Sequence, residues 1–275
     1  MDKICLNIAG IKVRVASENN VFMAELKKKY SAFLSKNPPQ VDIRIVHEKR
    51  LSLEEFIKLE KGNKGWALTS EEFSADISKD VRHVLARMAA DETTFNSFLR
   101  VIYTLFLLRH GGFLAHAAGL AKRARGFIFA GRSESGKTTA ARRMRDFEIL
   151  SDELVAVRKV DEEFRLFSTP FRGEFTGRIE NVNFPAKAVF FLTKNKTTRM
   201  QAFNKLDSLL RLLECVFFFC SDFESNRKIL KLVREFCYAV PGYSLNIENE
   251  THRRFVDEIF EKKDWPQPAG CLARD

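Results

Sequence analysis

The chain has 275 residues, 45% of them hydrophobic, with 26 phenylalanines and a formal net charge of +10 at pH 7. This composition predicts a folded globular protein, and the length predicts one large α/β unit with an appended smaller lobe. The longest uncharged apolar stretches, residues 101–108 and 215–220, are far shorter than the ~20 residues of a membrane-spanning helix. We therefore expect a soluble protein with no membrane partner.

The positive charge raises the question of a nucleic-acid partner. Basic residues are scattered among acidic ones over most of the chain, and the concentrated runs at 121–125 and 142–145 flank the candidate phosphate loop described below. Positive potential there would serve a nucleotide or an acidic substrate equally well. No aromatic–basic platform or zinc-finger spacing accompanies the charge, so nucleic acid is the less favoured partner.

The N-terminus and the cysteines predict a cytoplasmic protein. Residues 1–15 alternate apolar and polar and show neither a long apolar core nor a cleavage site of a secretory signal. The five cysteines are an odd number, contain no C-x-x-C and lie mostly in apolar segments, which predicts reduced core thiols rather than disulfides or a metal site.

A small α+β N-terminal lobe is predicted for residues 1–92. Alternation at 4–8 and 11–15 around Ala9-Gly10 predicts a β-hairpin, helical spacing predicts a helix over 21–34, and 41–46 alternates as a strand. Residues 51–59 are ambiguous between helix and strand, and 61–65 read as a turn-rich loop. Two short segments, 73–77 and 81–88, follow.

The second predicted domain covers residues 93–264 and is an α/β catalytic unit. Its first helix, over 93–108, has one broad apolar face and ends at Gly111-Gly112. Buried strands joined by loops are then predicted at 113–120, 127–130, 147–150, 155–160, 164–167 and 188–193. Helices at about 205–218 and 222–238, a strand at 243–247 and a helix at 251–262 follow, and 265–275 is a loose tail.

A phosphate-binding motif follows the strand at 127–130. Residues 131–138 fill every fixed position of G-x-x-x-x-G-K-[ST], with the apolar run 126–130 before them and a predicted helix at 139–145 behind. Glycines let the backbone N–H groups point at phosphates, Lys137 supplies a point charge, Thr138 would ligate Mg²⁺, and the helix N-terminus favours an anion. We therefore predict an ATP or GTP site made by Gly131, Arg132, Ser133, Glu134, Ser135, Gly136, Lys137, Thr138 and Thr139.

Two carboxylates end the next predicted strand. In Ile149-Leu150-Ser151-Asp152-Glu153 they come 15 residues after Lys137, which predicts a place at the carboxyl edge of the sheet beside the phosphates. They are candidates for the Mg²⁺ ligand, together with Thr138, and for the base that a kinase needs. A solvated acidic turn is the alternative.

Two further residues are candidates for the site. His116 lies in a small apolar strand that would neighbour the loop-bearing strand, and on the pattern alone a hydrogen-bonded core histidine is the stronger interpretation. Arg172, in Ser168-Thr169-Pro170-Phe171-Arg172-Gly173-Glu174, has a guanidinium that matches phosphate oxygens, with a surface loop as the alternative.

Taken in order, His116, the phosphate loop, Ser-Asp-Glu and Thr-Pro-Phe-Arg-Gly-Glu resemble the HPr kinase/phosphorylase catalytic domain, within the phosphoenolpyruvate carboxykinase-like P-loop fold. The resemblance covers about residues 98–192. It implies an active-site role for His116, because the family carries a histidine fifteen residues before the first loop glycine. It also implies that Asp152 is the base that takes the proton from a substrate serine and that Glu153 assists the metal.

The resemblance implies an ATP- and Mg²⁺-dependent kinase that phosphorylates a hydroxyl, in particular a serine of a protein or peptide. Asp152, His116, Lys137 and Arg172 would be catalytic, and Thr138, Asp152 and Glu153 would hold the metal. The Glu-Ile-Arg-Gly-Leu-Gly segment that the family associates with phosphorolysis is not found. A small-metabolite kinase and a nucleotide-binding regulator without turnover stay open as alternative functions. The chain could act as a homo-oligomer in any of these roles.

Overall fold

The computed structural model describes residues 1–48, 56–131, 147–177, 180–193 and 201–245. Its contacts divide the chain into two compact units, each with its own β-sheet. The first unit is Met1–Gly112 with Phe218–Ile229, and the second is Phe113–Phe217 with Leu230–Asp275. The 93–108 helix thus falls in the first unit, whereas the sequence interpretation begins the second domain with it. Within the described residues, no helix is long and apolar enough to cross a membrane.

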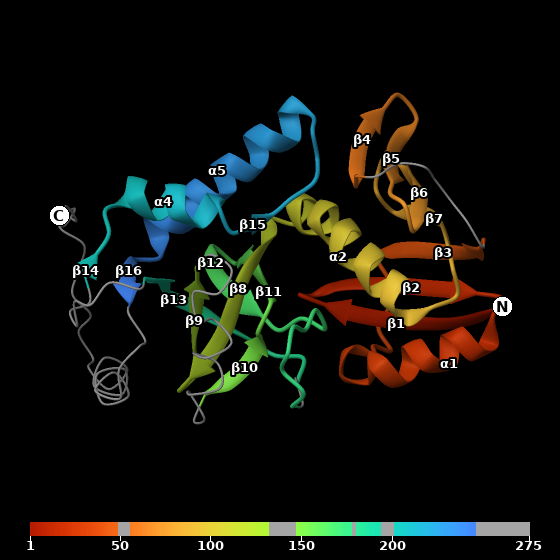
Figure 1. Ribbon diagram of the computed structural model, residues 1–275, viewed down its shortest axis with the longest axis horizontal. Coiled ribbons are helices and arrows are strands. Elements are labelled where there is room, and N and C mark those ends of the chain that lie inside the picture. The colour runs from red at the N-terminus through yellow and green to blue at the C-terminus, as the bar shows by residue number, and fades with distance from the viewer. Residues whose placement is uncertain (49–55, 132–146, 178–179, 194–200, 246–275) are drawn as a thin grey trace. The chain divides into compact units, whose positions relative to one another are not determined.

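The first unit contains a seven-stranded mixed sheet with the strand order β1-β2-β3-β7-β6-β5-β4 (Figure 1). Strands β2, β3 and β7 run parallel to their neighbours in that trio, and the other pairs are antiparallel. The strands are β1 (Asp2–Ile8), β2 (Ile11–Ser17), β3 (Val41–His47), β4 (Lys58–Gly62), β5 (Gly65–Thr69), β6 (Phe73–Ser78) and β7 (His83–Met88).

Three helical elements of the described chain lie wholly in this unit: the helices α1 (Asn20–Lys29) and α2 (Glu92–Arg109) and the 3-10 helix η1 (Ser31–Phe33). The predicted 21–34 helix is therefore too long, because Tyr30 caps α1 and the chain tightens into η1. Buried residues alternate along β1 to β3, and the helices pack on that buried face, where the rings of Phe22, Phe95 and Tyr30 meet edge to face. The Tyr103 hydroxyl on α2 donates to the Ile11 carbonyl oxygen at 3.2 Å.

The 61–65 segment is a hairpin turn rather than a loop. Strands β4 and β5 pair from Lys58↔Thr69 to Gly62↔Gly65, which leaves Asn63-Lys64 as a two-residue connection. Gly65 has φ +146°, and an added Cβ there would lie 2.0 Å from the Ile77 carbonyl oxygen on β6, so only glycine fits. The ambiguous 51–59 segment contributes its last two residues to β4, and residues 49–55 lie outside the described part.

Nine strands form the mixed sheet of the second unit, in the order β10-β8-β11-β12-β13-β16-β14, with β9 paired to β13 and β8 and with β15 paired to β8. They are β8 (Gly112–Lys122), β9 (Arg125–Ala130), β10 (Glu148–Ser151), β11 (Leu154–Val160), β12 (Glu163–Phe167), β13 (Asn183–Leu192), β14 (Gln201–Ala202), β15 (Val216–Phe217) and β16 (Gly242–Leu245). Both sheets mix parallel and antiparallel pairs, so the mixed α/β class is confirmed.

Helices α4 (Lys205–Leu213) and α5 (Phe223–Ala239) complete the described structure. The predicted helix over 205–218 was wrong in its last five residues, because Val216 and Phe217 pair with Ala115 and Leu114 of β8 instead. The predicted helices at 139–145 and 251–262 lie outside the described residues. An apolar cluster that includes Phe127, Phe129, Phe190 and Tyr243 forms the core around β9, β13 and β16.

Helix α2 begins at the N-cap Asp91, whose hydrogen bonds should contribute to the stability of the fold. The Asp91 carboxylate accepts from the N–H groups of Thr93 at 2.9 Å and Thr94 at 3.0 Å. Burial acts to raise the pKa of Asp91, but the hydrogen bonds from Thr94 and Thr93 outweigh it and leave the pKa below its ordinary value. The contribution of this cap to the free energy of unfolding should therefore be complete above the ordinary pKa of an aspartate. It should disappear as the pH falls through the lower pKa of Asp91 in the folded chain.

We expect Asp91→Ala to lower the free energy of unfolding by about 1 kcal/mol at neutral pH, because two helix N–H groups lose their acceptor. Urea denaturation at pH 7 measures the loss. Asp91→Asn is the matched control, since its side-chain oxygen still caps the helix, and equal losses in both variants would contradict the capping role.

Buried thiols make a chemical prediction. Four cysteines are free in the described residues, and burial raises the pKa of Cys220 and of Cys237 to about 12 each, with the Asp222 carboxylate adding to the shift at Cys220. Because the thiolate is the reactive form, both should resist iodoacetamide in the native protein at pH 8 and react after unfolding in urea. Mass spectrometry of tryptic peptides measures this, and native modification at the rate of a free cysteine peptide would show that these thiols are accessible.

Candidate active site

The β8–β9 hairpin carries the start of the predicted phosphate loop. Ala117 of β8 pairs with Ala130 of β9, so the next residues outward, His116 and Gly131, lie together at the open end of the hairpin. The His116 side chain is exposed, and its backbone N–H donates to the Cys215 carbonyl oxygen at 2.6 Å. This exposure argues against the core-histidine interpretation. Of the loop, Gly131 is described, and Arg132, Ser133, Glu134, Ser135, Gly136, Lys137, Thr138 and Thr139 lie outside the described residues.

The acidic turn lies beside the same strand. β10 pairs with β8 through Ile149↔Leu120 and Ser151↔Gly119, and the Ala117 N–H donates to the Glu153 carbonyl oxygen at 2.9 Å. A single stretch of β8 therefore holds the start of the loop on one side and Asp152-Glu153 on the other. The structure brings together His116 in the middle of β8, Gly131 at the end of β9 and the acidic turn at the end of β10.

Asp152 itself is buried, with only 5% of its surface exposed. One carboxylate oxygen accepts from the Gly173 N–H at 2.9 Å and the other from the Phe175 N–H at 2.8 Å. Gly173 approaches so closely that an added Cβ would lie 3.0 Å from a carboxylate oxygen of Asp152. The Asp152 carboxylate thus connects the backbone of residues 172–175 to the end of β10 through these two hydrogen bonds. The neighbouring Glu153 is partly exposed.

Ser151 and Thr169 fix the same two segments to each other. The Ser151 hydroxyl donates to the Phe171 carbonyl oxygen at 3.0 Å and accepts from the N–H groups of Glu153 and Leu154. The Thr169 N–H donates to the Leu150 carbonyl oxygen at 3.1 Å, and the Thr169 hydroxyl donates to the Leu154 carbonyl oxygen at 2.5 Å. Both hydroxyls are fully buried, and sequence reasoning missed them and the two amides on Asp152. The serine before the aspartate was the one available signal, because serine hydroxyls commonly bond backbone N–H groups a few residues on.

Arg172 belongs to the 172–175 segment that Asp152 holds. Its guanidinium donates to the Gly177 carbonyl oxygen at 2.9 Å, which fixes the side chain along its own loop, and the residue is partly exposed. A guanidinium has five N–H donors in a planar fork, a group that can bind more than one partner. The segment places Arg172 next in sequence to the Gly173 amide that holds Asp152.

The donor set at the acidic turn fits a magnesium ion. Asp152 and Glu153 offer carboxylate oxygens, the ligands that this cation prefers, and Mg²⁺ is usually held by one or two carboxylates together with phosphate oxygens and water. Among the described residues, no group of three or more histidines, cysteines or carboxylates could hold a metal ion by itself.

Comparison with known proteins places the chain in a family. The family model described as "SynChlorMet cassette protein ScmC" matches residues 84–261, which is more than half of the chain. The chain belongs to the ScmC family. A search of curated proteins finds no match. The match to the ScmC model includes His116, the whole phosphate-loop motif, Asp152, Glu153 and Arg172.

A search of solved structures finds similarity to an HPr(Ser) kinase/phosphatase from Coxiella burnetii. The identity is 12%, and the match covers 52% of this chain and 98% of that chain with a TM-score of 0.30. A likeness at this TM-score leaves the activity of the ScmC-family chain to be inferred from its own residues.

Proposed function

We propose that the chain is an ATP- and Mg²⁺-dependent kinase that transfers the γ-phosphate to a hydroxyl, in particular a serine of a protein or peptide. The observation that carries the proposal is the position of Ala117. It pairs with the residue before Gly131 and donates its N–H to Glu153, so the motif's first glycine and the acidic turn flank one strand. A phosphate loop with carboxylates beside it is the arrangement that phosphoryl transfer needs.

In this proposal the Gly131–Thr138 loop binds the triphosphate, with Lys137 on the β- and γ-phosphates. Thr138 with Asp152 or Glu153 would hold Mg²⁺, which supplies charge neutralisation on the phosphates. The hydroxyl oxygen of the acceptor forms a bond to the γ-phosphorus as the bond to the β–γ bridging oxygen breaks. Asp152 takes the hydroxyl proton, and ADP leaves. His116 and Arg172 would line the transferred group.

One observation favours a second candidate, a nucleotide-binding regulator without turnover. Asp152 is almost fully buried and both its oxygens already accept backbone N–H groups, which is the arrangement of a residue that fixes a loop. The second lone pair on each oxygen keeps the base role chemically open. The two candidates differ in whether the γ-phosphate is transferred.

The test combines nucleotide binding with transfer. Calorimetric titration with Mg-ATP and with Mg-GTP measures binding and nucleotide preference. Incubation with γ-labelled ATP and an array of peptides with a single central serine, beside the same peptides with alanine, measures transfer. Serine-dependent label supports the proposal, and label on free serine or glycerol instead would indicate a small-metabolite kinase. Binding without label on any acceptor supports the regulator, and the absence of binding rejects both candidates.

A further inference from the structure

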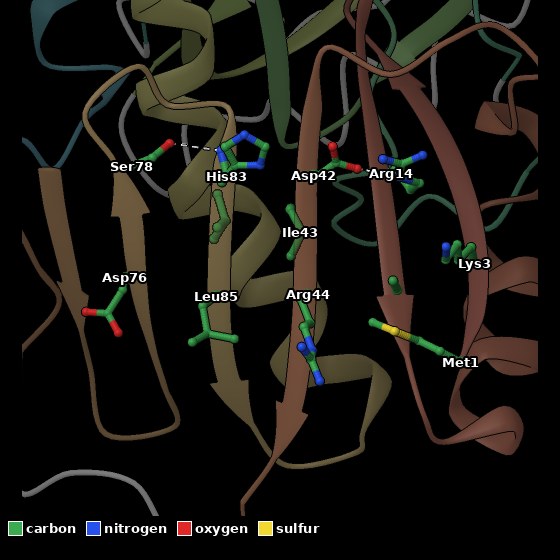
Figure 2. A pocket seen from close by; sticks show the side chains of 12 residues that line it. Met1, Lys3, Arg14, Asp42, Ile43, Arg44, Asp76, Ser78, His83 and Leu85 are labelled. Atoms are coloured by element: carbon green, nitrogen blue, oxygen red, sulfur yellow. Dashed lines mark hydrogen bonds and ion pairs between the residues drawn. The ribbon is translucent and has the colours of Figure 1, made fainter.

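The first sheet has a hollow on the face opposite α1 and α2. Along β1, β3, β7 and the first five residues of β2, buried residues alternate with residues that are exposed or partly exposed, so the second face of these strands meets solvent, with Ala16 buried among them. A cavity of about 490 Å³ opens there, and its lining includes Lys3, Arg14, Ala16, Arg44, His83 and Leu85. Figure 2 shows several of these side chains, which come from neighbouring strands. The face contains none of the residues proposed for phosphoryl transfer.

Strand register explains the hollow. Lys3 pairs with Ala16, Ala16 with Arg44, and Arg44 with Leu85, so these residues form one row across four strands. Ala16 is the small member of the row, between two long cationic side chains, and Arg14 precedes it by two residues on the same face of β2. Ala16 therefore forms the bottom of the hollow, and the longer side chains of Lys3, Arg14 and Arg44 surround it on three sides.

Cations outnumber carboxylates on the strands of this face. Five cations project from β1, β2, β3 and β7, against two carboxylates from β3 and β6: Lys3, Lys12, Arg14, Arg44 and Arg87, against Asp42 and Asp76. Asp42 pairs with Arg14, and Asp76 pairs with Arg87 at 2.8 Å. Glu18 and Glu48, which directly follow β2 and β3, lie 3.8 Å from Arg44 and Arg87.

The two cations beside Ala16, Lys3 and Arg44, have at most one weak ion pair among the described residues. Arg44 lies 3.8 Å from Glu18, and both of those side chains are mostly exposed, at 62% and 80%. Such an exposed pair contributes little and yields readily to a better partner. In the described part of the chain, Lys3 Nζ makes no ion pair.

We propose that this hollow is a docking site for an acidic, extended peptide segment of a protein partner. Lys3 and Arg44 are two strand spacings apart, about 10 Å, so a carboxylate over Ala16 can be reached by both. Leu85, next in the row and partly exposed, offers an apolar contact for a neighbouring side chain of the same segment. A strand of nucleic acid fits less well, because its closely spaced phosphates would also meet Asp42 and Asp76.

The experiment uses the full-length protein and a fluorescein-labelled synthetic peptide in which glutamates alternate with leucines and serines. Fluorescence anisotropy measures its affinity, with a peptide in which glutamine replaces every glutamate as the uncharged control. We expect binding of the acidic peptide that weakens with salt. Arg44→Glu should reduce the affinity about tenfold or more, because a like charge replaces the carboxylate's partner.

Two further variants separate charge from shape and from folding. Ala16→Leu should fill the hollow and weaken binding with no change in charge, and Lys3→Gln should weaken it through loss of one cation. Lys58→Glu is the matched control, because Lys58 is an exposed cation on β4 of the same sheet and lies outside the hollow. Thermal melts verify that each variant is folded. Unchanged affinity in Arg44→Glu and Lys3→Gln would overturn the proposal.

The nucleic-acid alternative is an arm of the same experiment. A labelled oligothymidylate that binds more tightly than the acidic peptide, and loses affinity in Arg44→Glu, would overturn the peptide proposal. Lys137→Ala protein should bind the peptide as the unmodified chain does. A failure of nucleotide binding would therefore leave this proposal standing, and a failure of peptide binding would leave the proposed kinase standing.

Discussion

Asp152→Asn is expected to lower turnover by ~10²–10⁴ while Mg-ATP affinity stays within a few-fold, since general base catalysis contributes about that much. The substitution also turns one oxygen into an NH₂ group that faces the N–H of Gly173 or Phe175. Two donors would then oppose each other in a buried place, so the unfolding free energy should fall by about 1–3 kcal/mol. Steady-state phosphate transfer and urea denaturation measure the two effects.

Ser151→Ala is the matched control for this experiment. It removes the hydroxyl that bonds Phe171 and the amides of Glu153 and Leu154, so it loosens the same junction without removing a carboxylate. A base role predicts that Ser151→Ala loses stability but keeps most of its turnover. Equal losses of turnover in both variants would reassign Asp152 to positioning of the 172–175 segment, and a loss of nucleotide binding in Asp152→Asn would reassign it to the metal.

Mg-ATP is expected to stabilise the native chain by ~2.7 kcal/mol at a hundredfold excess over the dissociation constant, because the ligand binds the folded state alone. Lys137→Ala should lose most of this stabilisation, since the lysine supplies the point charge on the β- and γ-phosphates. A thermal melt with and without Mg-ATP measures the difference.

Lys187→Ala provides the control for charge. Lys187 is an exposed lysine of β13 that pairs with Glu163 at 3.5 Å, and its removal changes the net charge by the same amount. The Mg-ATP shift should persist in this variant. An unchanged melting temperature of the unmodified chain at millimolar Mg-ATP would contradict a phosphate site.

Elements with a clear period are predicted to within a residue or two. The strand expected at 41–46 is Val41–His47, and the helix expected at 93–108 is Glu92–Arg109. In both cases burial on one face sets the pattern, and α2 adds an aspartate cap and a glycine at φ +69° just past its end, Gly111. These signals are local, so they can be read from the sequence.

The errors come from partners that are distant in the chain. Residues 216–217 have a helix-compatible pattern but pair with β8, about a hundred residues earlier, and no local signal reports such pairing. The same reason limits the site. The glycine motif and the acidic pair could be picked out by residue type and spacing, and His116 through the resemblance to the HPr kinase family. The amides of Gly173 and Phe175 could not, because any residue type supplies a backbone N–H and the fold decides where it points.

The turn that joins β8 to β9 bears on how the chain folds. Arg123 and Ala124 form this turn at φ of 50° and 58°, a region that residues with a Cβ enter at a cost of roughly 1–2 kcal/mol each. This cost weakens the hairpin as a local nucleus, and β9 also depends on β13, which pairs with it through Ala188↔Phe127 across some sixty residues. Pairings of this separation form slowly, because loop closure is unfavourable before any contact is made. Until then the phenylalanine-rich β9 and β13 are exposed, so refolding from denaturant should be slow and should compete with aggregation.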